Sequence, residues 1–345
     1  MKKTCFKLPL IGFVLISFTN LYANNIPIAT PGFSINLTGL YLQPNADNLI
    51  YAIYTHPLPV PAPNWSQVTL KPGYAPSFDL GLQYNFADLM NSANLDWLHV
   101  NTSDSNSFAA QGVNSSVAPP YYFGPLAQAF TGSAANSTSK FEVDNVNLTV
   151  SHIINLNGNI QLNPFAGLQY AYLKQDTTSN YVGVDNLARP YSITSLNISK
   201  FSGIGPRLGL NAIYFVTKRI GIAAKIGGSL LVGTINSQTN FNSFGAGNTT
   251  PAFTTLANQD QHKIVPEADT KLEASYTIPF KSEGSSLTFV AGYMITVYVN
   301  GINQVVPTAL VPGAFNGGTI AIETASQEQS NLSLNGPYAS VIWKI

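Results

Sequence analysis

Few residues in this sequence have types and spacings that could support catalysis or ligand binding. The glycine-rich stretch 203–209 (GIGPRLG) has the wrong spacing for a dinucleotide-binding loop, contains a proline and lacks a strand-to-helix setting. Neither a G-x-S-x-G nucleophile elbow nor a Walker loop is present. The histidines are far apart and lack metal-ligand spacing: His56, His99, His152 and His262. We therefore expect no catalytic residue, no metal site and no cofactor.

Charged and polar side chains at alternate positions of apolar segments carry more information. From Tyr74 to Phe86 one set of alternate residues is mostly apolar and the other is small or polar, as on the two faces of a β-strand. Segments 202–214 and 264–278 repeat this alternation. The polar faces of these and neighbouring segments hold Asp79, Gln83, Arg207, Asn211, Lys225, Glu267, Asp269, Lys271 and Glu273. Buried charges need water or partners, so we expect these residues to line the interior of a barrel.

The composition excludes several common protein classes. Only 9% of the 345 residues are charged, against 45% hydrophobic, with a mean hydropathy of +0.10 and a formal net charge of +0. Soluble domains usually carry about 25% charged residues, and nucleic-acid binders need a basic patch. Polar residues are spread throughout, and no mature run of about 18 apolar residues could span a bilayer as a helix. The 17 Tyr, 19 Phe and 27 Gly favour strands and turns.

The N-terminus has the organisation of a cleavable export signal. Lys2, Lys3 and Lys7 form a basic region before the apolar stretch Leu8–Phe18, which is too short to cross a bilayer as a helix. We expect cleavage after Ala23; a retained anchor helix is the alternative.

Cleavage after residue 23 has two consequences for the mature chain. It removes Cys5, the only cysteine, so residues 24–345 can form no disulfide. It also leaves 13 basic and 16 acidic residues, a charge too small to drive a specific electrostatic partner. We expect residues 24–345 to form a single barrel domain.

Ten segments have the alternation of β-strands. They are Phe33–Gln43, Tyr74–Phe86, Leu95–Thr102, Phe141–His152, Ile160–Leu173, Ser202–Tyr214, Ile220–Ile235, Ile264–Ile278, Leu287–Asn300 and Leu332–Ile345. Asn48–Thr55 either extends the first strand or forms another, so about 8–12 strands are compatible with the pattern. In Phe141–His152 the apolar positions change parity, which predicts a β-bulge near Asp144 and Asn145.

The connections between these segments alternate between short and long. Short connections are predicted at Ala87–Asn94, Asn155–Asn159, Val216–Arg219 and Pro279–Ser285. Long polar connections are predicted at Pro44–Gly73, Ser103–Ser139, Asp176–Ser199, Asn236–Gln261 and Gly301–Ser330. Short turns on one side and long loops on the other are typical of an outer-membrane barrel with periplasmic termini. The fold class is therefore all-β: a transmembrane antiparallel up-and-down β-barrel, with short periplasmic turns and long extracellular loops.

Aromatic residues on the apolar faces fall near the two ends of the strands. Such residues form girdles at the two interfaces of a membrane barrel. The candidates toward the long loops are Tyr41, Tyr74 and Tyr172. The candidates toward the short turns are Tyr84, Phe86, Tyr214, Tyr276 and Trp343.

Six short motifs resemble the Legionella-type major outer membrane protein family, in an order that covers nearly all of the mature chain. They are LTGLYLQP (37–44), FDLGLQY (78–84), FSGIGPRLG (201–209), LLVGT (230–234), IVPE (264–267) and GPY (336–338). The resemblance implies a β-barrel of the bacterial outer membrane, with porin-like behaviour and contact with host surfaces. The family's founding type is known for cysteine cross-linking, and a mature chain without cysteine cannot share it, so any homo-oligomer is not disulfide-linked.

Several functions remain open at this stage. The charged interior suits either a solute-selecting pore or a salt-bridged plug, and a plugged barrel would suit a surface adhesin that acts through its long loops. A barrel-embedded hydrolase and a soluble lectin-like sandwich fit the pattern less well. We expect as partners outer-membrane lipid and lipopolysaccharide, periplasmic chaperones, the barrel-assembly machinery and a host-cell surface, but no nucleic acid.

Overall fold

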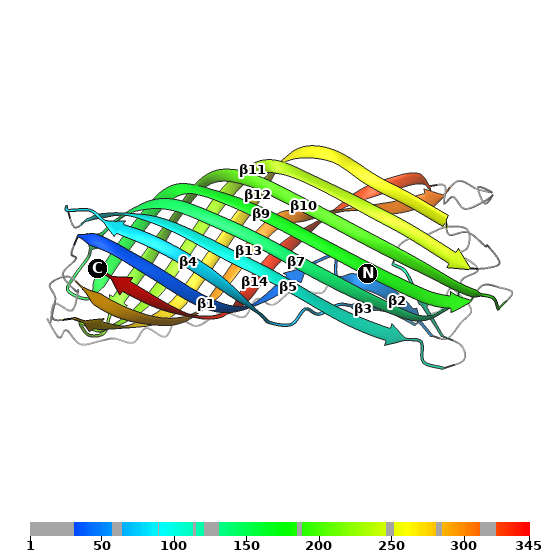
Figure 1. Cartoon of the computed structure of the whole chain (residues 1–345), viewed down its shortest axis with the longest axis horizontal. Coiled ribbons are helices and arrows are strands. Elements are labelled where there is room, and N and C mark those ends of the chain that lie inside the picture. Colours follow the sequence, from blue (N-terminus) through cyan, green and yellow to red (C-terminus); the bar gives the residue numbers. More distant parts are fainter. Residues whose placement is uncertain are drawn as a thin grey trace, which may run out of the picture.

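The computed structural model describes residues 31–56, 64–88, 90–112, 115–120, 131–184, 188–245, 252–280, 285–310 and 322–345. The predicted signal peptide and its cleavage site at Ala23 lie outside these ranges. Within them, no helix is long and apolar enough to cross a membrane. Strands make up nearly all of the regular structure (Figure 1).

The main sheet is built from long antiparallel strands. Its ten long strands are β1 (Gly32–Ala46), β4 (Ala75–Asn85), β5 (Asn91–Ala109), β7 (Thr131–His152), β9 (Ile160–Val184), β10 (Pro190–Phe215), β11 (Ile220–Gly245), β12 (Ala252–Pro279), β13 (Ser286–Leu310) and β14 (Ile322–Lys344). The two-residue β8 (Ile154–Asn155) pairs with β9. A separate small sheet contains β2 (Ile50–Thr55), β3 (Trp65–Thr69) and β6 (Ser116–Ala118).

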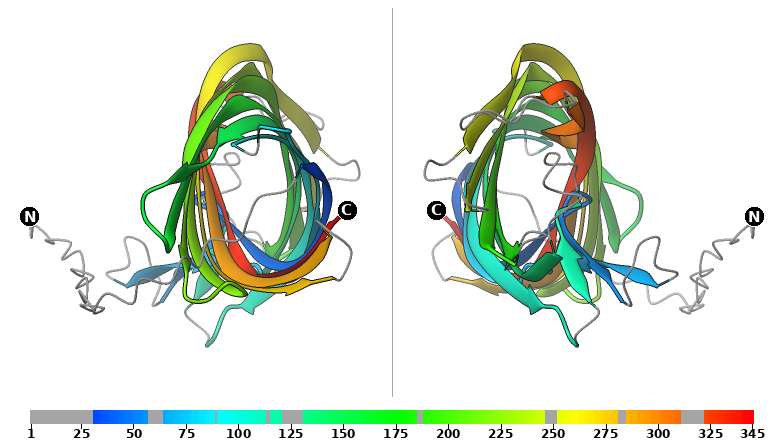
Figure 2. Two further views of the ribbon diagram at one scale, coloured as in Figure 1. Left: turned by 90° about the vertical axis from the view of Figure 1, so that its left-hand side faces the viewer. Right: turned by 90° about the vertical axis from the view of Figure 1, so that its right-hand side faces the viewer.

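The long strands close into a ring in which each pairs with its neighbours along the chain. The first and last strands complete it: Ile35 on β1 pairs with Trp343 on β14, and Leu37 pairs with Val341. Seen along the long axis, the strands surround an oval interior (Figure 2). The predicted antiparallel barrel of about ten strands is confirmed.

The outward face of the barrel carries an apolar band of limited height. On β11 the outward residues from Ile220 to Val232 are aliphatic or small, and Ile226 is 63% exposed. Beyond Val232 the outward positions become polar, beginning with Thr234 and Asn236. Thirteen residues at about 3.3 Å each, tilted by about 45°, rise roughly 30 Å, close to the thickness of a bilayer's hydrocarbon core. The outward face therefore matches lipid over this part of the barrel.

The strands continue well beyond the apolar band, where long connections were expected. β9 and β10 remain paired as far as Val184 and Pro190, so most of the expected loop 176–199 is strand. Likewise, β11 and β12 are paired up to Ser243 and Ala252. The sequence pattern missed these extensions because the outward face is largely polar there and the inward face mixes Ser and Thr with a few apolar residues such as Phe241, so the alternation is weak. The ladder of backbone hydrogen bonds does not depend on that alternation.

The β-bulge predicted near Asp144 is wrong. β7 pairs with both β5 and β9 without a register shift at that position. The apolar residues change parity because Phe141 and Val143 point into the interior, where both are 0% exposed, whereas Leu148 and Val150 point outward. β7 is therefore a regular strand whose inward residues change from apolar at Phe141 and Val143 to polar toward the short turns.

The limit of the apolar band can be tested on β11. Ile226→Arg places a charge near the middle of the band, and we expect it to lower the free energy of unfolding by about 2–4 kcal/mol. The matched variant Gln238→Arg lies on the outward face of the same strand, beyond the band, and should change the free energy of unfolding little. Urea titration of the folded protein in lipid vesicles, followed by the heat-modifiable shift in gel mobility, measures both. Equal destabilisation by the two variants would contradict the assigned band.

Candidate functional site: the barrel lumen

The structure places all of the predicted lumen residues on the inward face. On β4, buried Asp79 lies between the exposed residues Phe78 and Leu80. On β12, buried Glu267 and Asp269 alternate with outward-facing neighbours, and Lys271 and Glu273 continue the inward face. Arg207 and Asn211 on β10, Lys225 on β11 and Gln83 on β4 face the same interior.

Arg207 is the centre of a buried ionic cluster. Its guanidinium donates from Nη1 to Glu267 Oε2 at 3.0 Å and to Gln169 Oε1 at 3.1 Å, and Nη2 donates to Asp269. Ser229 also donates to Gln169, so four strands contribute to the cluster. Gln169 was not singled out in the sequence, although it lies on the predicted strand 160–173. The only signal for it was its parity, because an amide has no charge to attract notice.

Space for this cluster depends on a glycine on β11. A Cβ atom at Gly227 would lie 2.8 Å from Arg207 Nη2 and 2.6 Å from Asp269 Oδ2. Both distances are shorter than van der Waals contact, so a larger residue would displace the ion pair. The glycines of 203–209 have a related role, since a Cβ at Gly203 would lie 2.5 Å from the ring of Phe201.

Further charged residues extend the cluster around the interior. Lys271 Nζ lies 3.6 Å from Asp79 Oδ2 and 5.5 Å from the centre of the Tyr338 ring. The Tyr338 hydroxyl donates to Glu273 Oε2 at 2.5 Å, and Lys225 Nζ lies 5.0 Å from the centre of the Phe165 ring. We call the following set the charged belt: Asp79, Arg207, Lys225, Glu267, Asp269, Lys271 and Glu273.

Between the charged belt and the short turns, the interior is polar and half-buried. Three hydrogen bonds join side chains two residues apart on one strand: Gln83 donates to Asn85 at 2.9 Å, Asn94 to Asp96 at 2.6 Å, and Gln161 to Asn163 at 2.9 Å. These side chains are neither fully packed nor fully exposed. We call this end of the lumen the vestibule.

On the other side of the charged belt, the lumen is filled by an apolar core. Its largest fully buried side chains come mostly from seven long strands and include Phe141, Leu173, Phe201, Ile235 and Tyr298. Asn145 donates to the Tyr298 hydroxyl at 3.1 Å, which satisfies the phenol in this apolar setting. The core was not expected from the sequence, because its members lie where the two-residue alternation is weak.

Part of β13 enters this core and closes the outer lumen, whereas residues 324–329 of β14, which pair with it, are mostly exposed. The β13–β14 pairing shifts between Tyr298 and Ile302, and beyond that point the hairpin leaves the wall. The backbone N–H of Asn303 donates to the inward-facing Ser199 Oγ at 2.9 Å, and Thr239 Oγ1 donates to the carbonyl oxygen of Val305 at 2.7 Å. We call residues 302–310 and 322–330 the lumenal hairpin.

The turn between β1 and β2 also packs into the interior, on the same side as the lumenal hairpin. The side-chain amides of Asn48 and Gln175 exchange hydrogen bonds of 2.8 and 3.1 Å. The Tyr181 hydroxyl donates to the carbonyl oxygen of Tyr51 at 2.5 Å. These contacts are on β9, next to the strands that hold the hairpin, and Asn48 and Gln304 line one small cavity.

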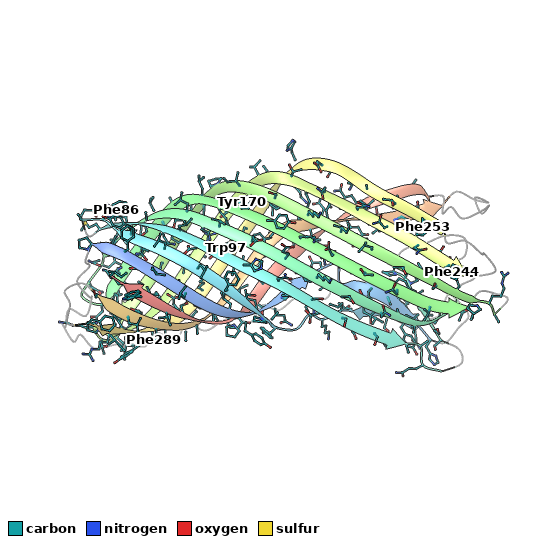
Figure 3. All side chains as sticks on the ribbon, in the orientation of Figure 1. Phe86, Trp97, Tyr170, Phe244, Phe253 and Phe289 are labelled. Carbon is teal, nitrogen blue, oxygen red and sulfur yellow. The ribbon has the colours of Figure 1, made fainter. Side chains whose placement is uncertain are left out.

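The predicted girdle residues all lie on the outward face. Tyr41 and Tyr74 stack with ring centres 5.5 Å apart, and Tyr84 and Phe86 meet edge to face at 5.3 Å. Tyr276 and Trp343 are exposed, whereas Tyr172 and Tyr214 are half-buried. Outward-facing Trp97, Tyr170 and Phe289 belong to the same two levels and were not predicted (Figure 3).

Comparison with known proteins gives one family and distant structures. Residues 25–345 match the family described as the Legionella pneumophila major outer membrane protein precursor. No curated protein matches the sequence significantly.

Three solved structures illustrate the distant matches. The outer membrane protease OmpT from Escherichia coli has 11% identity and a TM-score of 0.44, covering 94% of this chain and all of its own. The toluene transporter TodX from Pseudomonas putida has 10% identity and a TM-score of 0.38, covering 92% of this chain and 91% of its own. A FadL homologue from Pseudomonas aeruginosa has 10% identity and a TM-score of 0.28, covering 90% of each chain.

The buried ion pairs of Arg207 can be tested by replacement. Arg207→Leu leaves two carboxylates buried without their partner, and we expect it to lower the free energy of unfolding by about 3–5 kcal/mol. The triple variant Arg207→Leu, Glu267→Gln, Asp269→Asn should recover most of this loss. Lys225→Leu, on the neighbouring strand, is the matched control and should have a smaller effect. A triple variant no more stable than Arg207→Leu alone would refute the pairing.

Proposed function

The chain belongs to the Legionella pneumophila major outer membrane protein family and is a β-barrel of the bacterial outer membrane, and we propose that it serves as a passive channel for small hydrophilic solutes. Its lumen is closed at the outer end in this conformation. The observation that carries the proposal is the inward face itself. On β12 every inward position from Thr277 to Glu267 is polar or charged, behind a wall that is apolar toward lipid, and other strands add a few apolar residues such as Phe165 and Met294.

The polar groups of the lumen support a path for solutes rather than a purely structural filling. The vestibule amides are half-buried, and they connect the charged belt to the periplasmic end of the barrel. Ions in a barrel interior keep their hydration or pair with one another, as the side chains of the charged belt do. Closure is confined to the outer part, where the lumenal hairpin and the β1–β2 turn pack into the apolar core.

Channel activity can be measured in planar bilayers. We expect wild-type protein to show rare, small conductance steps, because the outer lumen is filled. Replacing residues 303–327 by a short Gly-Ser turn should make the steps frequent and larger. Heat-modifiable gel mobility confirms that both proteins are folded before the recording. If neither folded protein gives any conductance step, the channel proposal is wrong.

The charged belt also predicts ion selectivity. Its four carboxylates exceed its three basic groups, and the inward-facing Asp96 adds a further carboxylate nearby. We expect a preference for cations, seen as a reversal potential in a salt gradient. Glu273→Gln should reduce that potential. Glu142→Gln, which removes an outward-facing carboxylate, should not; an equal effect of the two variants would contradict selection by the belt.

A second candidate function is adhesion to a surface outside the cell. The β11–β12 hairpin carries Phe244 and Phe253 on its outward face, 52% and 61% exposed, far beyond the apolar band (Figure 3). Exposed aromatic side chains at such a site are typical of binding surfaces.

Adhesion can be tested without disturbing the barrel. Replacing Phe244 and Phe253 by serine should lower the binding of cells to a host surface several-fold and leave gel mobility unchanged. Exchanging Gln238 and Thr255 for alanine on the same hairpin is the control. Unchanged binding by the aromatic double variant would count against this candidate.

A further inference from the structure

The wall of the barrel has an unpaired edge where the lumenal hairpin leaves it. β12 and β13 are paired from Pro279 and Ser286 up to Glu267 and Tyr298, where the pairing ends. Among the described residues, β12 continues to Ala252 with β11 on one side and no strand on the other. An exposed strand edge presents unpaired N–H and C=O groups and is normally covered or paired.

The position of this edge suggests which segment pairs with it. We propose that the lumenal hairpin is a gate, whose β13 segment exchanges its place in the lumen for the free edge of β12. This inference rests on the proposed channel function and specifies how the channel opens. The same β13 segment would occupy either the lumen or the edge of β12, so the opening requires no partner from outside the chain.

A hinge lies where this exchange would require one. Asn300 has φ of 54°, in the left-handed region that few residues other than glycine adopt readily. At the adjacent Gly301, a Cβ atom would lie 2.9 Å from Leu173 Cδ1, so glycine permits the close approach to β9. β13 thus turns out of the wall at these two residues, and its pairing with β14 resumes at Ile302 and Ser330 after a register shift.

The lumenal position leaves several buried polar groups without partners. Asn303 is 2% exposed, and neither its amide nitrogen nor its amide oxygen has a hydrogen-bond partner among the described residues. The same holds for the hydroxyls of Ser195 and Ser237, on the wall strands that face the hairpin. Unsatisfied buried groups favour any arrangement that returns them to water. The closed packing is therefore poised to open.

Two side-chain contacts span the gap between β12 and the displaced strands. Lys263 Nζ donates to the carbonyl oxygen of Asn300 at 2.8 Å, directly at the hinge. Gln327 on β14 donates to Gln261 Oε1 at 2.9 Å. Neither contact uses the backbone edge of β12, so each can break or rearrange while the edge accepts a strand.

The existing register specifies the alternative pairing. Continuing the antiparallel alignment from Glu267 and Tyr298 places His262 opposite Asn303 and Asp260 opposite Val305. Moving β13 to this edge would uncover the hydroxyls of Ser199 on β10 and Thr239 on β11. The opened passage would be lined by uncharged hydrogen-bonding groups on that side.

Engineered disulfides can trap each position, because the only native cysteine is Cys5. Ser199→Cys with Asn303→Cys links the hairpin to the lumen wall. His262→Cys with Asn303→Cys links it to the free edge of β12. The control pair, Ser137→Cys with Ser179→Cys, links two wall strands whose hydroxyls lie 2.9 Å apart. Disulfide formation is scored by mass spectrometry on folded protein in outer membranes, and conductance is recorded before and after reduction.

We expect both hairpin pairs to form disulfides. Oxidation of the Ser199–Asn303 pair should lower the opening frequency at least about tenfold, and oxidation of the His262–Asn303 pair should raise it by a similar factor, both reversibly. The control pair should leave it unchanged. Failure of the His262–Asn303 disulfide, with the lumenal disulfide complete, would overturn the gate. So would channels that open equally with the lumenal disulfide intact and reduced.

The two proposals fail in different ways in this experiment. If the His262–Asn303 disulfide forms but all proteins remain silent in bilayers, the hairpin moves and the channel function is wrong. If conductance is present but insensitive to both hairpin disulfides, the channel function stands and the gate is wrong.

Discussion

The structure depends on one constraint: in hydrocarbon, a backbone N–H or C=O without a hydrogen-bond partner costs several kcal/mol. A sheet can meet this condition only by closing on itself, and the pairing of β1 with β14 does so at residues such as Ile35 and Trp343. Closure then fixes the two faces. The outward side chains must suit lipid, and the inward ones are free to be polar, so the charged belt can exist at the level of the membrane.

The interior changes character along the axis because the solvent outside the wall changes. Within the apolar band, Arg207 and its carboxylates compensate one another in the lumen. Beyond the band, the outward face becomes polar and the interior takes apolar residues, with Phe201 and Ile235 fully buried. The lumenal hairpin can pack there because its inner surroundings resemble those of an ordinary protein core.

The sequence predicted the part of the fold that lipid constrains. On β11, the alternation from Ile220 to Val232 located the strand, its direction and the inward position of Lys225. It could not locate the continuation to Gly245, since the outward face is largely polar there and the inward face mixes Ser and Thr with a few apolar residues. It also mistook the inward turn of Phe141 for a bulge. The burial of Ile302 and Asn303 was beyond prediction, because it depends on side chains of β10 and β11 that are 104 and 66 residues away in sequence from their partners on β13.

The apolar core in the outer lumen has a thermodynamic consequence for the molecule. Unfolding this part transfers buried hydrocarbon side chains to water, which increases the heat capacity as it does for soluble domains. Residues of the apolar band, by contrast, face lipid in the folded state and do not depend on that transfer for their position. The two ends of one continuous ring of strands are therefore stabilised by solvents of opposite kind, and temperature acts on each of them differently.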